Sequence, residues 1–338
     1  MGSILSILSS WIITLTAKLK LLRSGLKEKH VDIVVKPSDP PIRAHYLERK
    51  SKGGEHTKDL LLIPGFTATG DLILSDLVWA LKPNVPEGWR IIVMELPLHG
   101  KNICNFDGKF PDFEEMKDYL WAFIQAVGMG KNDGVPLSLC GYSLGGNPCL
   151  RVLHEHPNSI DKVVLIAPAF PETRKPNFIE MGLEDPRKIH CWQNLEDVRH
   201  FGKAVAGCHD GHLMMYTAIL LGMVRQRSEQ YGKAYEGNFF AEYASATGML
   251  EKESTESSNT NPLDPSRLNK IRNPLLLIVG DRDACISPQT CQTLIAEAID
   301  SCTVCELSDT GHYAGPANSP DSNIFYESAP AIGKFLFP

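Results

Sequence analysis

The sequence predicts an α/β protein with a mostly parallel sheet, covered by helices on both faces, and a helical insert in the middle of the chain. Short apolar runs alternate with segments whose apolar residues recur at helical spacing, which is typical of parallel sheets. One apolar run, residues 135–140, leads directly into Gly-x-Ser-x-Gly and a helical pattern. Residues 170 to about 261 contain no convincing strand, and this break predicts the insert.

The elements of the sheet can be placed in chain order. Two strands open the domain, and the prolines between them at positions 37, 40 and 41 predict a turn. The apolar runs predict strands at residues 31–35, 42–47, 59–63, 90–94, 135–140, 162–167, 274–280 and 303–307. The helical stripes predict helices at residues 113–127, from 143 to about 156, and at 288–300.

Ser143 is the candidate nucleophile because of the run Leu139-Cys140-Gly141-Tyr142-Ser143-Leu144-Gly145-Gly146. A serine in this motif, between a strand and a helix, occupies a sharp strained turn that presents its hydroxyl at the end of the sheet. Gly141 and Gly145 lack a Cβ, so the strand and the helix can pass close together. The turn also points the N–H of Leu144 and the positive end of the helix at the reacting group. The alternative is an ordinary turn serine.

A catalytic serine needs a base, and the base needs an orienting acid. In this strand–turn–helix architecture both follow the serine along the chain. Asp283, after the apolar run 274–280, is the candidate acid; Asp281 competes with it, and its other role is to cap or bend the turn. His312, on the loop after the last strand, is the candidate base, and its alternative is a solvated turn histidine.

A second backbone donor for an oxyanion is expected from the loop after residues 59–63. That loop reads Pro64-Gly65-Phe66-Thr67, so the N–H groups of Phe66 and Leu144 form the candidate oxyanion hole. The ring of Phe66 also suits an aromatic plug at the base of the loop, which is compatible with a donor role for its N–H.

Together these residues resemble the α/β-hydrolase superfamily, from about Val31 to the C-terminus apart from the insert. The resemblance implies the α/β-hydrolase fold, a catalytic triad and a helical cap. Pro64-Gly65 stands where the family often has His-Gly, which keeps the backbone donor but removes a possible supporting side chain. His99 lies in a run similar to the family's loop after the fourth strand. We expect it to bond loop backbone, with contact to the pocket as the alternative.

Composition limits the function classes. A hydrophobic content of 43% and a charged content of 22% fit a globular protein with a sizeable core, and a net charge of −6 gives no electrostatic case for nucleic acid. The nine cysteines are scattered, and Cys302 and Cys305 fall on a predicted strand that points them to opposite faces. We expect reduced thiols, no metal and no cofactor; His209-x-x-His212 is a weak metal pattern that surface or cap histidines also explain.

The N-terminus differs from the rest of the chain. Residues 1–17 carry no charged side chain, and five basic residues follow by position 29. A spanning helix needs about 20 apolar residues, and the basic residues come after the apolar run, which argues against a cleaved signal peptide. Helical spacing predicts instead an interfacial helix whose apolar stripe is Ile4, Leu8, Trp11, Leu15, Leu19, Leu22 and Leu26. Three alternatives remain: a spanning helix, for which the segment is at the lower limit of length, a myristoyl anchor at Gly2, and a soluble helix packed on the domain.

The membrane hypotheses, a spanning helix or a helix held at the surface, all place the catalytic domain on the cytoplasmic side, because positive charge stays inside. We divide the chain into an N-terminal membrane-associating segment (1–29), a hydrolase core (30–169 and 262–338) and a helical cap with a polar linker (170–261). The insert is rich in Met and aromatic residues, which accept flexible chains, although such stripes are more often helix–helix core. The candidate substrate-binding residues are Tyr142, Met214, Met215 and Tyr216.

The sequence therefore predicts a serine hydrolase that cleaves a carboxylic ester, with a lipid such as monoacylglycerol as the expected substrate and a membrane surface as partner. This layout looks like the membrane-anchored monoacylglycerol lipases of the α/β-hydrolase-domain group. A thioesterase, an acyltransferase or a carbon–carbon bond hydrolase could use the same triad. A non-catalytic ligand receptor on the hydrolase fold is the alternative from another class. The sequence does not give the oligomeric state.

Overall fold

The structure is a computed structural model that describes residues 15, 17–50, 55–66, 70–97, 99, 101–102, 111–130, 134–175, 261–313 and 323–338. Several sequence predictions lie outside the described residues: the substrate contacts of Met214, Met215 and Tyr216, the histidine pattern at 209–212, nearly all of the cap, and the myristoyl anchor and first part of the apolar stripe in residues 1–14.

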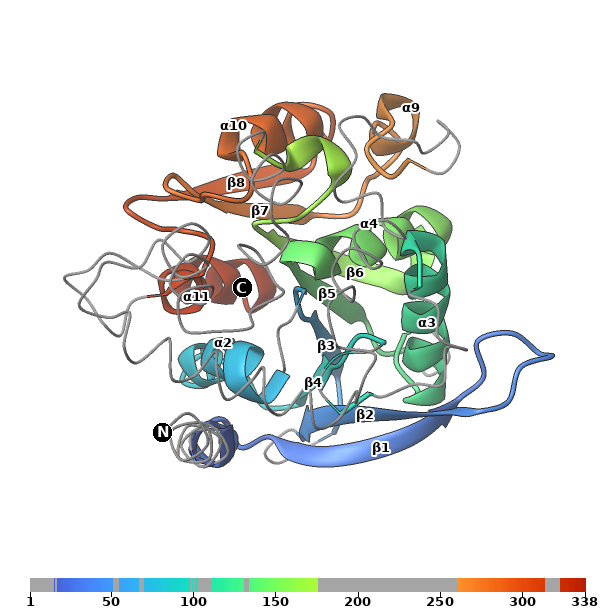
Figure 1. The fold of residues 1–338 in the computed structure, drawn as a ribbon. Coiled ribbons are helices and arrows are strands. Elements are labelled where there is room, and N and C mark those ends of the chain that lie inside the picture. The colour runs from blue at the N-terminus through green and yellow to red at the C-terminus, as the bar shows by residue number, and fades with distance from the viewer. Residues whose placement is uncertain are drawn as a thin grey trace, which may run out of the picture.

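The described elements alternate between strands and helices along most of the chain (Figure 1). The strands are β1 (Lys27–Ile33), β2 (Ile42–Arg49), β3 (Lys58–Ile63), β4 (Trp89–Met94), β5 (Leu137–Tyr142), β6 (Ile160–Ile166), β7 (Leu275–Gly280) and β8 (Cys302–Leu307). The α-helices are α2 (Ser75–Leu81), α3 (Phe113–Ala126), α4 (Gly146–Glu155), α9 (Pro265–Leu268), α10 (Pro288–Cys291) and α11 (Ile324–Leu336). Short 3₁₀ or π turns are η1 (Gly70–Leu74), η3 (Ser143–Gly145), η4 (Pro157–Ser159), η5 (Pro171–Thr173) and η8 (Gln292–Ala296).

The strands form one sheet in the order β1-β2-β4-β3-β5-β6-β7-β8. β4, β3, β5, β6, β7 and β8 run parallel, and β2 is antiparallel to both β1 and β4. The mostly parallel, doubly covered sheet predicted from the sequence is therefore confirmed. Because parallel strands end at one edge, the loops after β3, β5, β7 and β8 meet there.

Helices cover both faces of the sheet (Figure 1): α3 and α4 pack on one face, α2 and α11 on the other. The central strands are buried on both faces, and β5 is buried along its whole length. This explains why they read as unbroken apolar runs and not as alternating ones. Cys302 packs against one hydrophobic cluster and Cys305 against the other, so they point to opposite faces as predicted. None of the described cysteines forms a disulfide.

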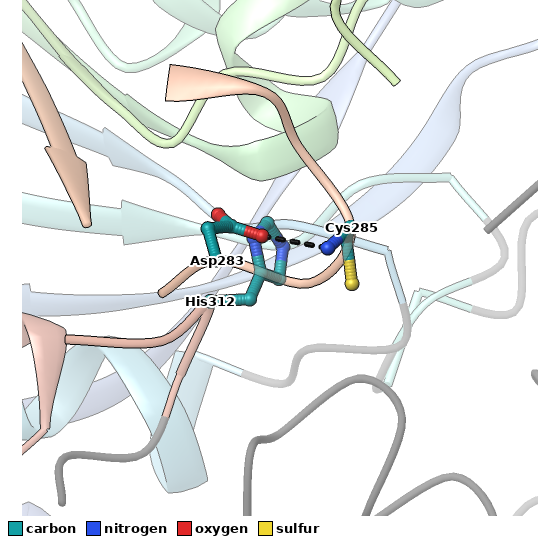
Figure 2. Close-up of side chains that lie close together, drawn as sticks. All are labelled: Asp283, Cys285 and His312. Carbon is teal, nitrogen blue, oxygen red and sulfur yellow. Dashed lines mark hydrogen bonds and ion pairs between the residues drawn. The ribbon is translucent and has the colours of Figure 1, made fainter. Parts of the chain in front are cut away.

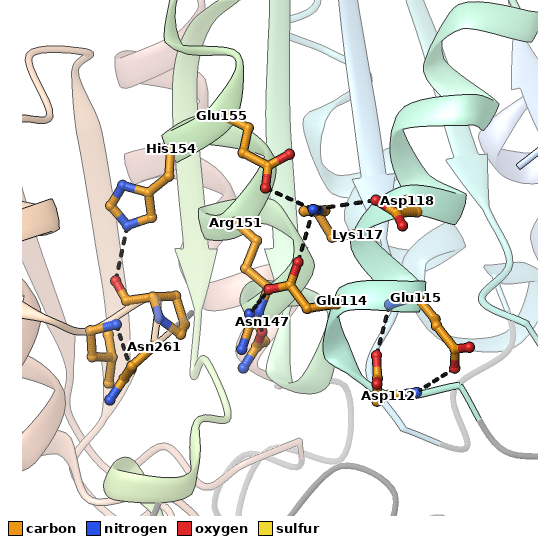
Figure 3. A network of polar contacts seen from close by, with 12 residues as sticks. Asp112, Glu114, Glu115, Lys117, Asp118, Asn147, Arg151, His154, Glu155 and Asn261 are labelled. Atoms are coloured by element: carbon orange, nitrogen blue, oxygen red, sulfur yellow. Dashed lines mark hydrogen bonds and ion pairs between the residues drawn. The ribbon is translucent and has the colours of Figure 1, made fainter. Parts of the chain in front are cut away.

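A polar network joins α3 to α4 (Figure 3). The ammonium of Lys117 lies 2.8 Å from Glu114 and 2.7 Å from Glu155. Burial opposes its charge, but the ion pairs outweigh burial and raise the pKa of Lys117. Arg151 pairs with Glu114, and its Nε donates to Asn147 Oδ1 at 2.6 Å. Since Asn147 lies in the first turn of α4, the network anchors the helix that begins directly after Ser143.

The ends of some elements differ from the sequence prediction. β1 begins at Lys27, not at residue 31, so the segment 1–29 overlaps the strand by its last three residues. The helix expected at 288–300 is α10 followed by the π turn η8. Three helices, α2, α9 and α11, are not predicted from the sequence. The inner sides of α2 and α11 fill one face of the core.

Leu15 and residues 17–24 are helical; we call them the N-terminal helix. Lys20 pairs with Asp76 on α2 at 2.7 Å, and Ala17 and Ser24 are buried against the domain. Gly25, at a φ of +77°, ends the helix and turns Leu26 into the core, where its side chain is only 5% exposed. Leu26 therefore does not belong to the exposed stripe predicted for it. Within the described residues, no helix has the length and apolar character needed to cross a bilayer.

Candidate active site

Ser143 follows β5 directly and has a φ of +51°, a left-handed conformation that is costly for a residue with a Cβ. The turn is held by close packing: a Cβ added to Gly145 would lie 2.5 Å from the carbonyl oxygen of Ile63. The N–H of Ala169, beyond β6, donates to the carbonyl oxygen of Ser143 at 2.9 Å. The strained strand–turn–helix geometry expected around Ser143 is present.

His312 connects the serine to an acid. Its Nε2 lies 3.0 Å from Ser143 Oγ, and its Nδ1 lies 2.7 Å from Asp283 Oδ2. A carboxylate only accepts hydrogen bonds. The Nδ1 proton is therefore donated to Asp283, and Nε2 can accept the proton of the serine hydroxyl. The structure thus brings Ser143, Asp283 and His312 together from the ends of three strands, with His312 in hydrogen-bonding distance of the other two.

The surroundings of Asp283 distinguish it from Asp281. The side chain of Asp283 is 1% exposed, and its Oδ1 accepts the N–H groups of Cys285 at 2.8 Å and Ile286 at 2.9 Å. These bonds fix the carboxylate and leave Oδ2 for His312. Asp281 is exposed and accepts the N–H of Thr310 at 3.1 Å, which is the turn-forming role that competed with catalysis in the sequence.

Tyr142 supports the histidine loop. Its buried hydroxyl donates to the carbonyl oxygen of His312 at 3.1 Å, and its ring packs on the rings of His312 and Phe325. Burial raises the pKa of Tyr142 well above its ordinary value, so the phenol stays protonated and remains a donor. The sequence suggested that Tyr142 contacts substrate. Its ring lies between His312 and Phe325 of α11, and contact with substrate stays a prediction.

The loop after β3 lies against the serine. A Cβ at position 65 would be 2.8 Å from the Cβ of Ser143, so Phe66 and Leu144 belong to two loops that meet beside the nucleophile. The ring of Phe66 packs edge-on to His99 and on the core, which agrees with the plug interpretation. His99 is buried and its Nδ1 lies 2.8 Å from the carbonyl oxygen of Pro97, as expected for a histidine that bonds loop backbone.

Cys285 lies beside Asp283 and His312 (Figure 2). One ligand atom from each of these three residues lies within 4.8 Å of the others, which makes them the candidate metal group of the described residues. A thiolate would be required for metal binding, but burial raises the pKa of the Cys285 thiol well above its ordinary value. The hydrogen bonds of Asp283 and His312 fit an acid–base pair with an apolar thiol at its side.

The chain entering the insert is fastened to the loop that carries the acid. Ser287 N–H donates to the carbonyl of Thr173 at 2.7 Å, and Lys175 N–H donates to that of Cys285 at 2.9 Å. Arg174 and Ile286 form an antiparallel bridge between these bonds. This junction and the role of Tyr142 are absent from the sequence analysis, because both depend on pairings between distant segments.

Comparison with known proteins agrees with this geometry. Residues 59–316 match the model of the alpha/beta hydrolase fold family. The chain belongs to the α/β-hydrolase family. The match spans the strands that carry Ser143, Asp283 and His312, and it includes the insert. No curated protein sequence matches the chain.

Solved structures share the α/β-hydrolase fold across nearly the whole chain. A bacterial membrane phospholipase A described as a virulence factor superposes with a TM-score of 0.70 at 19% identity, covering 99% of this chain and 93% of its own. A putative lipase from Acinetobacter baumannii has a TM-score of 0.64 at 17% identity, with coverages of 95% and 93%. Carboxylesterase CesB from Bacillus subtilis has a TM-score of 0.63 at 13% identity, with coverages of 97% and 98%. At these identities the likeness establishes the fold alone.

Proposed function

We propose that this α/β-hydrolase is a serine hydrolase that cleaves the carboxylic ester of a lipid, such as a monoacylglycerol, through an acyl-enzyme on Ser143. The observation that carries the proposal is the pair of contacts made by His312: 3.0 Å to Ser143 Oγ and 2.7 Å to Asp283 Oδ2. These are the distances at which a base can remove the serine proton while an acid holds it in the required tautomer.

In the first half of the reaction, Ser143 Oγ attacks the ester carbonyl carbon while His312 Nε2 takes the hydroxyl proton. Asp283 stabilises the resulting imidazolium. The carbonyl oxygen becomes an oxyanion, which the N–H groups of Leu144 and Phe66 would bind; one such donor is worth about 3 kcal/mol in comparable sites. The tetrahedral adduct then collapses, the C–O bond to the alcohol breaks, and His312 returns its proton to the leaving alcohol.

In the second half, water attacks the acyl carbon of the Ser143 ester. His312 again takes a proton, now from the water, and Asp283 again balances its charge. Collapse of the second adduct breaks the bond to Ser143 Oγ, which recovers the proton from His312, and the fatty acid leaves. The site residues, the ester and one water account for all atoms and protons in both halves of the reaction.

The N-terminal helix supports the choice of a lipid ester. Its side chains Leu15, Leu19 and Leu22 are 59%, 51% and 78% exposed. They follow the spacing of one helical face and are three of the five exposed large hydrophobic side chains of the described residues. Exposed leucines in one stripe, with Lys18 beside them, suit a helix lying at a membrane surface. We propose that this helix holds the catalytic domain on the cytoplasmic face of a membrane, beside its substrate.

The proposal is tested with Ser143→Ala on a soluble p-nitrophenyl ester and on vesicle-borne monoacylglycerol. Removal of the nucleophile should lower kcat by at least about 10⁴-fold on both substrates, and a fluorophosphonate probe should label the wild-type protein but not the variant. Ser38→Ala, which changes an exposed serine of the β1–β2 connection, is the matched control and should behave as wild type. Hydrolysis by Ser143→Ala at the wild-type rate would refute the assignment.

Substrate class is decided by a panel of acylglycerols, acyl-CoA thioesters and simple esters. Preference for monoacylglycerol supports the lipid-ester proposal. Preference for acyl-CoA would assign the same triad to a thioesterase. Folded protein that neither labels with the probe nor turns over any ester would favour a ligand receptor on this fold.

A further inference from the structure

A cavity of about 810 Å³ opens beside the N-terminal helix, away from the triad. It lies between the C-terminal end of α2, the start of β4, the end of β2 and the middle of α11. Its volume is in the range of small-molecule sites. The aromatic rings of Trp79, Trp89 and Tyr326 supply part of its wall.

The charged side chains of the wall are mostly basic. Arg49, Lys50 and Lys82 line the cavity, and Glu87 is the acidic residue among its described walls. Nη1 of Arg49 is buried and has no hydrogen-bond partner in the described part of the chain. Burial lowers the pKa of Arg49, and no carboxylate offsets that effect. A buried guanidinium nitrogen without a partner is costly. Because Arg49 lines the cavity, its guanidinium lies beside any anion that enters.

The cavity adjoins the helix that carries the exposed leucines. Lys82 Nζ donates to the carbonyl oxygen of Arg23 at 2.8 Å, at the end of that helix. The Arg23 guanidinium and the Lys82 ammonium also lie 4.6 Å and 5.0 Å from the ring centroid of Trp79. The chain neighbour of Arg23 is Leu22, which is 78% exposed. Basic groups and an aromatic ring thus flank the apolar face, an arrangement suited to the headgroup level of a membrane.

We propose that this cavity binds the phosphate headgroup of an anionic phospholipid in the membrane on which the N-terminal helix lies. A guanidinium and two ammonium groups match the charge and hydrogen-bonding pattern of a phosphate monoester. The volume exceeds that of phosphate alone, and the aromatic wall offers contact to the glycerol and upper acyl carbons. The inference rests on the membrane association proposed above, and it adds a lipid class that the helix alone would not distinguish.

The test measures binding of the full chain to two sets of vesicles: phosphatidylcholine alone, and phosphatidylcholine with phosphatidic acid. Phosphatidic acid should increase binding of the wild-type protein. Arg49→Met keeps most of the apolar stem. It should reduce the increase caused by phosphatidic acid by on the order of tenfold and leave binding to phosphatidylcholine unchanged. Lys50→Met is the second variant. Lys82 is kept, because it holds the end of the helix.

Lys270→Met is the matched control. Lys270 is exposed and follows α9, at the opposite end of the molecule from the N-terminal helix (Figure 1). Lys270→Met removes one positive charge, as do Arg49→Met and Lys50→Met. A general electrostatic effect would therefore lower binding equally in all three variants, and that outcome would overturn the proposal. Thermal melting of each variant separates loss of folding from loss of binding, and Lys50→Met tests the site even if Arg49→Met unfolds.

Two further outcomes separate the sources of phosphate and the two proposals. Competition by millimolar inorganic phosphate as strong as that by phosphatidic acid would overturn a lipid headgroup and indicate a site for a soluble anion. Failure of the wild-type protein to bind either set of vesicles would refute the membrane association itself. Preference for phosphatidic acid that depends on Arg49 and Lys50, but not on Lys270, supports the cavity as the binding site.

Discussion

The carboxyl edge of the sheet and the flank formed by the N-terminal helix are built in opposite ways. At the edge, Ser143, His312 and Asp283 are at most 8% exposed, and each has its hydrogen-bond partner inside the chain. On the flank, Leu22 is 78% exposed and Nη1 of Arg49 has no partner among the described residues. The hydrogen bonds of the edge are completed within the chain, whereas the role proposed for the flank requires an outside molecule. Changes to the two regions should therefore affect different measurements.

The largest expected effect is that of Asp283→Asn. The Asn amide would present an N–H₂ group or a weaker acceptor to His312 Nδ1, which favours the wrong tautomer for the base. We expect kcat to fall by on the order of 10³- to 10⁴-fold, equally on a soluble ester and on vesicle-borne lipid. Asp281→Asn is the control and should cost less than a few-fold, since Asp281 bonds only the turn at Thr310. Equal losses in the two variants would remove Asp283 from the catalytic assignment.

The second effect separates the flank from the edge. Leu19→Gln combined with Leu22→Gln should lower activity on vesicle-borne monoacylglycerol by on the order of tenfold or more, because about 1.5–3 kcal/mol is lost for each leucine that is fully buried in the membrane. Activity on a soluble short-chain ester should not change. Val304→Gln alters an exposed apolar side chain of β8 and serves as control. A parallel loss on both substrates would mean that the helix belongs to the folded core and does not dock on lipid.

Tyr142→Phe distinguishes support of the base from contact with substrate. The variant removes the hydroxyl that donates to the carbonyl of His312 and keeps the ring contacts. Loss of one hydrogen bond worth about 1 kcal/mol should lower kcat by about fivefold on a soluble ester while KM stays unchanged. A raised KM with unchanged kcat would instead support the substrate contact suggested by the sequence.

The smallest effect on activity comes from a residue outside both regions. His154 on α4 bonds the carbonyl of Pro262, where the chain returns from the insert (Figure 3), and burial lowers its pKa from 6.5 to about 4. In the unfolded state His154 binds a proton near pH 6.5, whereas in the folded state it does so only near pH 4. The free energy of unfolding should therefore fall by up to about 3 kcal/mol as pH drops from about 6.5 to about 4. His154→Gln should flatten this loss in denaturant titrations while activity at neutral pH stays constant. A pH slope equal to that of wild type would assign the acid sensitivity to other groups.

The sequence was sufficient for the parts of the molecule that local patterns encode. Apolar runs located every strand from β2 to β8 to within a few residues. The signal is clearest for central strands such as β5, which are buried on both faces. Ser143, Asp283 and His312 could be assigned because each lies in the turn or loop that follows a predicted strand. α11 was not predicted, since Pro330 lies inside the helix, and α2 follows a π turn that disturbs the helical spacing.

Other features depend on contacts that a single chain segment does not contain. The hydroxyl of Tyr142 bonds a carbonyl 170 positions away, and nothing in the motif around Ser143 distinguishes that orientation from one toward substrate. Leu26 has the spacing of the exposed leucines, but Gly25 redirects the chain. The basic cavity unites Arg49, Trp79 and Tyr326 from three separate elements, so only the folded chain brings them together.

The stretch from Ala169 to Lys175 has a mechanical consequence. At one end its N–H bonds the carbonyl of Ser143, and at the other it is bonded to the loop after Asp283. It therefore links the backbone at Ser143 to the loop after Asp283, and this link does not involve His312. The sequence of the insert can thus vary in length and composition while the spacing of Ser143 and Asp283 is kept, provided that these seven residues stay in place.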